Sequence, residues 1–128
     1  MSIRDAIYKQ YGLLITTGEG YITAAEIQIH QDHLLSDPAF DPKFDQLIDV
    51  TTAVHLDMTA AEAKEIAWRP IVSPNSRRAF AATSIHIFAL CRLMEIQHEA
   101  HNGTEVQIFT ARHEALKWLR VPEDSGLY

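Results

Sequence analysis

The sequence predicts an α/β domain, a sandwich of about five mostly parallel strands and about four helices. Short apolar segments that suit interior strands alternate with helical segments along most of the chain. The tetrapeptide Thr-Ala-Ala-Glu occurs twice, and each copy is a capping box that marks the start of a helix. Because helices connect successive strands, most strands are expected to pair in parallel.

Length and composition indicate one globular domain over residues 1–128, with 121–128 as a C-terminal tail. The net charge of −6 argues against a broad nucleic-acid surface, and the basic pair Arg77-Arg78 is expected at a solvated strand entrance. Cys91 is the only cysteine, and the sequence has no apolar run near the roughly 20 residues of a membrane span and no signal-peptide pattern. We therefore expect a cytoplasmic domain.

The first half should contain two strands, a capped helix and a central strand. Residues 6–17 are rich in β-branched and aromatic types, and Gly12 marks the bend between two short strands. The first capping box predicts a helix over 24–35, which two Asp-Pro steps end. The apolar run over 44–50 then predicts a buried strand.

The second half continues the alternation. A short loop after residue 50 should lead to the second capping box, formed by Thr59 and Glu62. The later elements are expected as a helix over 60–68, a strand over 78–83, a helix over 85–100, a strand over 105–109 and a helix over 111–119.

Six short segments carry a resemblance to a known family. They are Gly20-Tyr-Ile-Thr23 with Glu26, Asp37-Pro-Ala-Phe40, Leu47-Ile-Asp49, Arg92-Leu-Met-Glu95, Val106-Gln-Ile-Phe109 and Glu114-Ala-Leu-Lys-Trp-Leu119. Together they resemble the SpoIIAA-like branch of the STAS superfamily, the sulphate transporter and anti-sigma-factor antagonist domains. The resemblance implies a STAS-like fold and a regulatory role in binding a partner. That branch is also similar in layout to CRAL-TRIO lipid-binding domains.

Signalling STAS proteins carry an Asp-Ser pair after the central strand, and a partner kinase phosphorylates the serine. The matching segment here is Leu56-Asp57-Met58-Thr59, with Met58 in place of the serine. Since methionine cannot accept a phosphate, the phospho-switch is not carried over. Thr59 is expected to act as a helix cap.

The edge between the central strand and the second helix is one candidate partner-binding site. Its candidate residues are Asp49, His55, Asp57 and Thr59. The two aspartates could anchor a basic residue of a partner or a cation. The alternative, which we favour, is that they bond backbone N–H groups of the loop.

The helix over 85–100 is the other candidate site. It is apolar around almost its full circumference, whereas packing on a sheet needs a face of about 100°. Either a loop and the tail cover its outer face, or residues 85–96 contact another molecule, for example in a homodimer. Facing inward, the helix could instead line an apolar pocket against the sheet. The candidate side chains are Phe88, Leu90, Arg92 and Met94.

Two histidine-containing helix faces are weak metal candidates. They are Glu26, His30 and His33, and Glu95, His98 and His101. Such spacing can bring ligands together, yet each face also has the composition of a solvated stripe, and we expect no metal site.

Cofactor and nucleophile motifs are incomplete. Gly18-Glu-Gly20 lacks the third glycine of a dinucleotide fingerprint, so these glycines are expected in a turn before a helix, without a cofactor. An apolar setting should keep Cys91 a protonated thiol. We predict a non-enzymatic cytoplasmic regulatory or interaction domain that binds a partner protein or a small apolar ligand. The alternatives are a lipid carrier with its pocket between the 85–100 helix and the sheet, and a metal-assisted enzyme.

Overall fold

The computed structural model describes residues 2–102 and 104–128, and the side chains of residues 99–102 lie outside that description. The strands are β1 (Ile3–Tyr8), β2 (Leu13–Thr23), β3 (Asp45–Asp57), β4 (Arg77–Ala81) and β5 (Glu105–Phe109). The α-helices are α1 (Ala24–Ser36), α2 (Ala60–Trp68), α3 (Ile85–Asn102) and α4 (Arg112–Trp118). Two 3-10 helices, η1 (Lys9–Tyr11) and η2 (Glu123–Ser125), complete the described elements.

The strands form one sheet in the order β1-β2-β3-β4-β5. β1 is antiparallel to β2, and the other three pairings are parallel. Gly12 turns the chain from η1 into β2 with a left-handed φ of 56°, a conformation that glycine adopts without strain. The predicted α/β sandwich with mostly parallel strands is confirmed.

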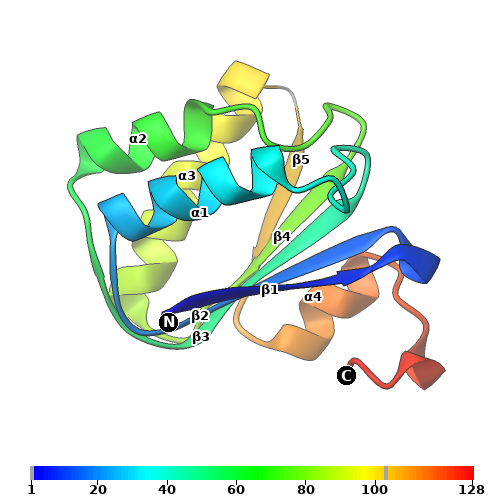
Figure 1. Ribbon diagram of the computed structural model, residues 1–128. Helices are drawn as coiled ribbons and strands as arrows, with labels where there is room; N and C mark the ends of the chain where they lie inside the picture. The colour runs from blue at the N-terminus through cyan, green and yellow to red at the C-terminus, as the bar shows by residue number, and fades with distance from the viewer. Residues whose placement is uncertain (1, 103) are drawn as a thin grey trace.

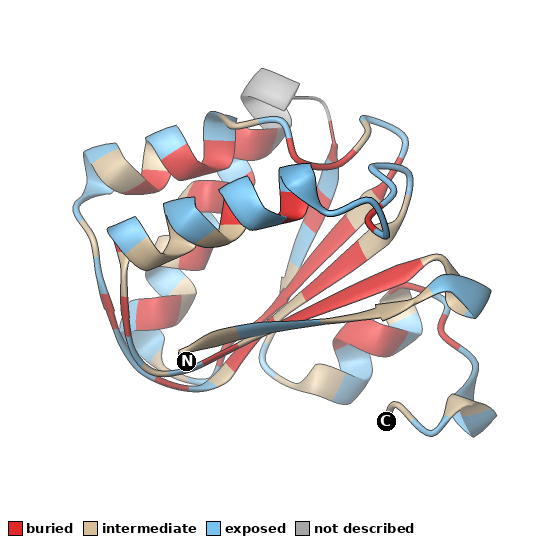
Figure 2. Ribbon diagram, in the orientation of Figure 1, coloured by how far each residue is buried: buried red, intermediate tan, exposed pale blue. Residues whose placement is uncertain are grey.

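The helices cover the two faces of the sheet unequally: α1, α2 and α3 lie on one face and α4 lies on the other (Figure 1). Side chains alternate along each strand, so Leu13, Leu47 and Ala79 pack towards α4, while Val50 and Phe80 pack towards the three-helix face. Figure 2 shows the buried central strands between these layers. Both faces of the sheet therefore belong to the core.

The predicted short loop after residue 50 is wrong, because β3 continues to Asp57. The second half of β3 pairs with the second half of β2, and the last register pair joins Thr23 to Asp57. The two strands curve away together from the rest of the sheet (Figure 1). Because each strand leads into a capping box, α1 and α2 begin beside each other.

The expectation of a glycine turn before the first helix is also wrong, since Gly18 and Gly20 lie inside β2. The register with β3 shifts between Thr17 and Glu19 and between Gly20 and Tyr21, so the glycines sit at irregularities of the strand. A Cβ at Gly18 would lie 2.6 Å from Cδ1 of Ile22. These glycines therefore permit the strand to bend instead of ending it.

Candidate ligand-binding site

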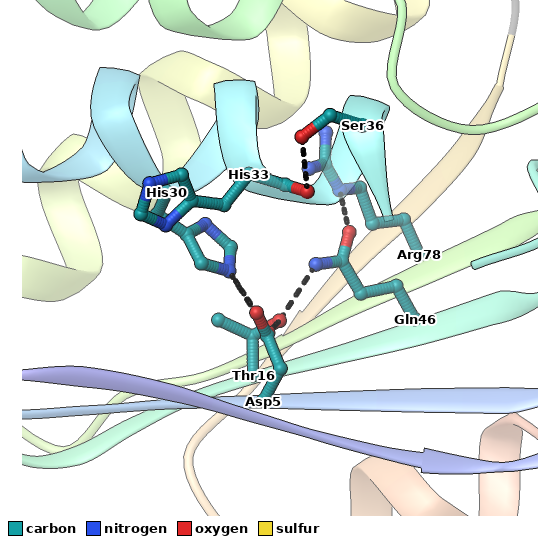
Figure 3. Close-up of polar contacts among 7 residues, drawn as sticks. All are labelled: Asp5, Thr16, His30, His33, Ser36, Gln46 and Arg78. Atoms are coloured by element: carbon teal, nitrogen blue, oxygen red, sulfur yellow. Dashed lines mark hydrogen bonds and ion pairs between the residues drawn. The ribbon is translucent and has the colours of Figure 1, made fainter. Parts of the chain in front are cut away.

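A row of hydrogen-bonded polar side chains crosses four strands on the three-helix face (Figure 3). Arg78 Nε donates to Gln46 Oε1 at 2.8 Å, Gln46 Nε2 donates to Thr16 Oγ1 at 2.9 Å, and Thr16 Oγ1 donates to Asp5 Oδ1 at 2.6 Å. Asp5 and Thr16 are register partners, as are Gln46 and Arg78. Strand pairing thus brings the members of the row together.

Asp5 is the acceptor at one end of this polar row. His30, on α1, places Nε2 within 2.8 Å and 2.7 Å of the two carboxylate oxygens. Since the Thr16 hydroxyl accepts from Gln46, its own hydrogen is available for Asp5. Each member of the row therefore donates a hydrogen bond to the next, from Arg78 through Gln46 and Thr16 to Asp5.

A cavity of about 80 Å³ lies between the polar row and the three helices. Most of its lining is apolar, and the apolar side chains include Ile22, Leu34, Val50, Phe80 and Met94. Its polar side chains are Thr16, His30, Gln31, Gln46, Arg78 and His98. Ile3 and His30 also line an outer depression of about 380 Å³ beside the start of β1, so the two spaces adjoin at these residues.

The buried titratable groups of the cavity are one cation and two side chains that are neutral at pH 7. Burial lowers the pKa of Arg78 to about 10, which leaves the guanidinium charged. Burial, and next the charge of Arg78, lower the pKa of His98 to about 4. Its Nδ1 lies 2.8 Å from the Ala67 carbonyl oxygen, an acceptor, so Nδ1 carries the proton. Burial raises the pKa of the Cys91 thiol to about 12.

Gln31 is a buried amide that projects from α1 into the same cavity, with 3% of the residue exposed. Its Nε2 donates to the Ile66 carbonyl oxygen at 3.2 Å, and this acceptor fixes the orientation of the amide. Within the described residues, Gln31 Oε1 has no hydrogen-bond partner. An unsatisfied buried acceptor is costly, so a donor at this position would be stabilising.

Asp49, the first candidate of the predicted edge, is held inside the chain on the α4 face. Its Oδ2 lies 2.9 Å from Arg112 Nη1, and its Oδ1 accepts from the backbone N–H and the hydroxyl of Thr51 at 3.0 Å and 2.7 Å. Burial alone would raise the pKa of Asp49, but the hydrogen bonds from Thr51 and Arg112 and the charge of Arg112 outweigh it and lower the pKa below 3.8.

The other three candidates of that edge lie at the far end of β3. His55 is exposed and its ring contacts that of Tyr21, with the centroids 5.7 Å apart. Asp57 is exposed at the strand end, and Thr59 Oγ1 accepts from the Glu62 backbone N–H at 3.1 Å as the predicted cap. The edge therefore does not gather its four candidates into one site.

The long helix α3 has one buried stripe and one exposed stripe. The buried stripe is Ile87, Cys91, Met94 and His98, and the exposed stripe is Ile85, Ala89, Arg92 and Ile96. Of the pocket candidates, Met94 lines the cavity, whereas Phe88 and Leu90 are half-buried against the adjoining core. Arg92 pairs with Glu95 at 3.0 Å. The tail packs beside α4, where Tyr128 Oη donates to the Val121 carbonyl, and leaves the exposed stripe uncovered.

The two histidine faces differ in position. Glu26, His30 and His33 line the outer depression, with Glu26 engaged in its capping box and His30 with Asp5. Glu95 and His98 are buried, and the side chain of His101 lies outside the described residues. In the described part of the chain, no group of three or more His, Cys, Asp or Glu side chains is placed to hold a metal ion.

The polar row and Gln31 were missed by the sequence reasoning, and the expectation that Arg78 is solvated is wrong. Arg78 is 7% exposed, because side-chain alternation in β4 turns it inward while Arg77 points to the α4 face. The sequence did contain one sign of the polar row, since Gln46 is a polar residue within a strand that was predicted to be buried. The partners of Gln46 could not be predicted, because they depend on the register of the strands.

Comparisons with known proteins bear on the fold. The structure is similar to that of an uncharacterised protein of the DUF3478 family with a SpoIIAA-like fold from Shewanella loihica PV-4, with a TM-score of 0.58, 16% identity and 91% of each chain covered. The predicted SpoIIAA-like fold is thereby confirmed. No protein-family model and no curated protein matches the chain. Among the described residues, none of the helices combines the length and apolar character needed to cross a bilayer.

Proposed function

We propose that this SpoIIAA-like domain is a non-enzymatic, cytoplasmic binding module whose cavity beneath α1, α2 and α3 takes a small, largely apolar molecule. The observation that carries the proposal is the cavity of about 80 Å³ in the middle of the larger core cluster. Protein interiors are close-packed, so a void of this size in a core is unusual unless it is filled. A larger apolar cavity, of about 150 Å³, binds benzene or xenon.

The chemistry of the lining favours binding over catalysis. Cys91 stays protonated at neutral pH because burial raises its pKa to about 12, and the Nδ1–H of His98 is directed to the Ala67 carbonyl. A cysteine nucleophile needs a lowered thiol pKa, which is the opposite of the shift at Cys91. These groups are suited to shaping and polarising a binding site.

The approach to the cavity is expected between the start of β1 and α1. Ile3 and His30 line both the outer depression and the cavity, and His30 is held by Asp5. A movement of the His30 ring would connect the two spaces. The proposed ligand therefore enters past one side chain, without separation of the sheet from the helices.

The test is binding of xenon to freshly purified protein, followed by NMR shifts of the methyl groups that line the cavity. Native mass spectrometry of the same sample looks for a co-purified small molecule. Cys91→Met fills the cavity with a flexible side chain and should reduce the xenon shifts, while Ala89→Met, on the exposed stripe of the same helix, should not. Unchanged wild-type spectra under xenon pressure would rule out an accessible cavity.

A second candidate function, self-association through α3, is favoured by its exposed stripe. Ile85 is 84% exposed and Ile96 is 53% exposed on the same side of the helix. Large exposed apolar side chains on one face are typical of contact surfaces. Light scattering over a concentration series should detect a dimer that Ile85→Asp disrupts. A strict monomer at all concentrations would remove this candidate.

A further inference from the structure

Arg78 is buried, and among the described residues no carboxylate lies within ion-pair distance of it. Five other arginines pair with a carboxylate: Arg4 with Glu19, Arg69 with Asp32, Arg77 with Glu105, Arg92 with Glu95 and Arg112 with Asp49. Arg120, the remaining arginine, is exposed. Arg78 reaches Asp5 only through three successive hydrogen bonds. A buried charge without a counter-charge is unfavourable, and a bound anion would relieve it.

The free edge of this guanidinium suits a planar anion. Its Nε–H is used by Gln46, and no hydrogen bond from its two terminal nitrogens is made to the described residues. Figure 3 shows the guanidinium rising from β4 towards α1, and Arg78 is one of the residues that line the cavity. Two terminal N–H groups in a fixed fork match the two oxygens of a carboxylate.

Gln31 Oε1 is a second group in the cavity that lacks a hydrogen-bond partner within the described part of the chain, and it requires a donor. Gln31 Oε1 is a buried acceptor without a partner among the described residues, and Gln31 lines the cavity together with Arg78. A carboxylate cannot satisfy it, because an ionised carboxylate only accepts. A hydroxyl can.

We propose that Arg78 binds the carboxylate of a small organic acid in this cavity, and that Gln31 accepts a hydrogen bond from a hydroxyl of the same molecule. The inference rests on the proposed function of the cavity and names its ligand class. The small volume of the cavity, about 80 Å³, restricts the ligand to short-chain hydroxy acids of about four carbons or fewer. The apolar lining accommodates the carbon chain.

The experiment is a calorimetric titration of the full chain with four probes: 2-hydroxybutyrate, butyrate, butyramide and inorganic phosphate. We expect 2-hydroxybutyrate to bind most tightly and butyrate to bind about tenfold more weakly, since it lacks the donor for Gln31. Butyramide should bind more weakly still, because it brings no charge to Arg78. Phosphate binding as tightly as 2-hydroxybutyrate would overturn the assignment of a carboxylate.

Variants separate the two recognition groups. Arg78→Met should weaken 2-hydroxybutyrate binding by about tenfold or more, and Gln31→Leu should remove the preference for 2-hydroxybutyrate over butyrate. Arg77→Met, a change at the neighbouring residue on the opposite face, should leave the affinity unchanged. Arg78→Lys keeps the charge but loses the fork, and an intermediate affinity is expected. It replaces Arg78→Met if that variant does not fold.

The outcomes distinguish this inference from the proposed function. Xenon entry without binding of either acid overturns the organic-acid ligand and leaves a small-molecule cavity. Failure of xenon and of all four probes overturns both. Equal 2-hydroxybutyrate affinity of the wild type, Arg78→Met and Arg78→Lys would show that the anion is held elsewhere.

Discussion

On the face of the sheet that α4 covers, Asp49 and Arg112 form an ion pair. On the face that α1, α2 and α3 cover, Arg78 has no carboxylate within ion-pair distance among the described residues. The α4 face also holds Arg77, which lies over the ring of Trp118, and the rest of its packing is apolar, with Leu13, Leu47, Leu116 and small alanines in contact. The three-helix face contains the polar row and the cavity. On the α4 face the buried charges of Asp49 and Arg112 pair with each other. On the three-helix face the described residues leave the charge of Arg78 and the Oε1 atom of Gln31 for a ligand to pair with.

The largest expected difference between the two faces concerns packing. Leu116→Ala, on the α4 face, removes a side chain that is 0% exposed and should lower the free energy of unfolding by about 4 kcal/mol. Met94→Ala, beside the cavity, should lower it by only about 2 kcal/mol, because the site is already loosely packed. Urea denaturation measures both. Val54→Ala, at a residue that is 64% exposed, is the control, and a larger loss for Met94→Ala would contradict the contrast.

The free energy of unfolding should depend on pH through His98, which lies on the three-helix face. His98 has a pKa of about 4 in the folded protein against 6.5 for an unperturbed histidine, so the unfolded chain binds the proton first as the pH falls. The contribution of neutral His98 to the free energy of unfolding should therefore be complete above pH 6.5 and fall by roughly 3 kcal/mol as the pH drops from 6.5 to about 4.

His98→Asn isolates this effect, because the asparagine amide can occupy the position of Nδ1 and still donate to the Ala67 carbonyl. The variant should lose less stability than the wild type between these two pH values in urea titrations. Parallel pH profiles for the two proteins would assign the acid sensitivity to other groups.

Much of the fold could be predicted because its signals are local. The helix starts after Thr23 and Thr59 follow from hydrogen bonds to residues three positions along, and both capping boxes are observed. The reversal at Gly12 follows from its left-handed backbone. The length of β3 could not be predicted in this way, because its second half is held by pairing with β2.

The site was harder to predict because its members come from separate segments. Thr16, Gln46 and Arg78 occupy three strands, and polar residues in strands usually face solvent. Only the register shows that they form one row. Phe88, Leu90 and Met94 were predicted together to line an apolar pocket, and of the three only Met94 lines the cavity. The helix is apolar around almost its full circumference, so its sequence did not show which side faces the sheet.

On the α4 face, Asp49→Asn should lower the free energy of unfolding by about 2 kcal/mol at pH 7, since Arg112 loses its counter-charge. The pKa of Asp49 in the folded protein lies below 3.8. The stability that the ionised carboxylate contributes is therefore complete above pH 3.8 and is lost as the pH falls through the folded pKa. Chemical denaturation at pH 7 and about pH 2 measures the change. Asp57→Asn, at an exposed strand end, is the matched control, and an effect of Asp49→Asn that is equal at both pH values would contradict the ion-pair explanation.

The smallest and sharpest test uses the two neighbouring arginines of β4. Arg77 lies over the ring of Trp118, 3.8 Å from its centroid, and donates to the Trp118 carbonyl, so Arg77→Met should lower the free energy of unfolding by about 1 kcal/mol. Arg78→Met should change it by less than about 0.5 kcal/mol, because removal of an unpaired buried charge offsets the lost bond to Gln46.

A bound organic acid should reverse the order of these two variants. At a ligand concentration about 100 times the wild-type Kd, the wild type and Arg77→Met should each gain about 2.7 kcal/mol, while Arg78→Met, which binds at least about tenfold more weakly, should gain about 1.4 kcal/mol or less. Thermal and urea denaturation with and without 2-hydroxybutyrate measure the gain. An equal gain in all three proteins would mean that the charge of Arg78 does not hold the ligand, and the contrast between the two faces would then be one of packing alone.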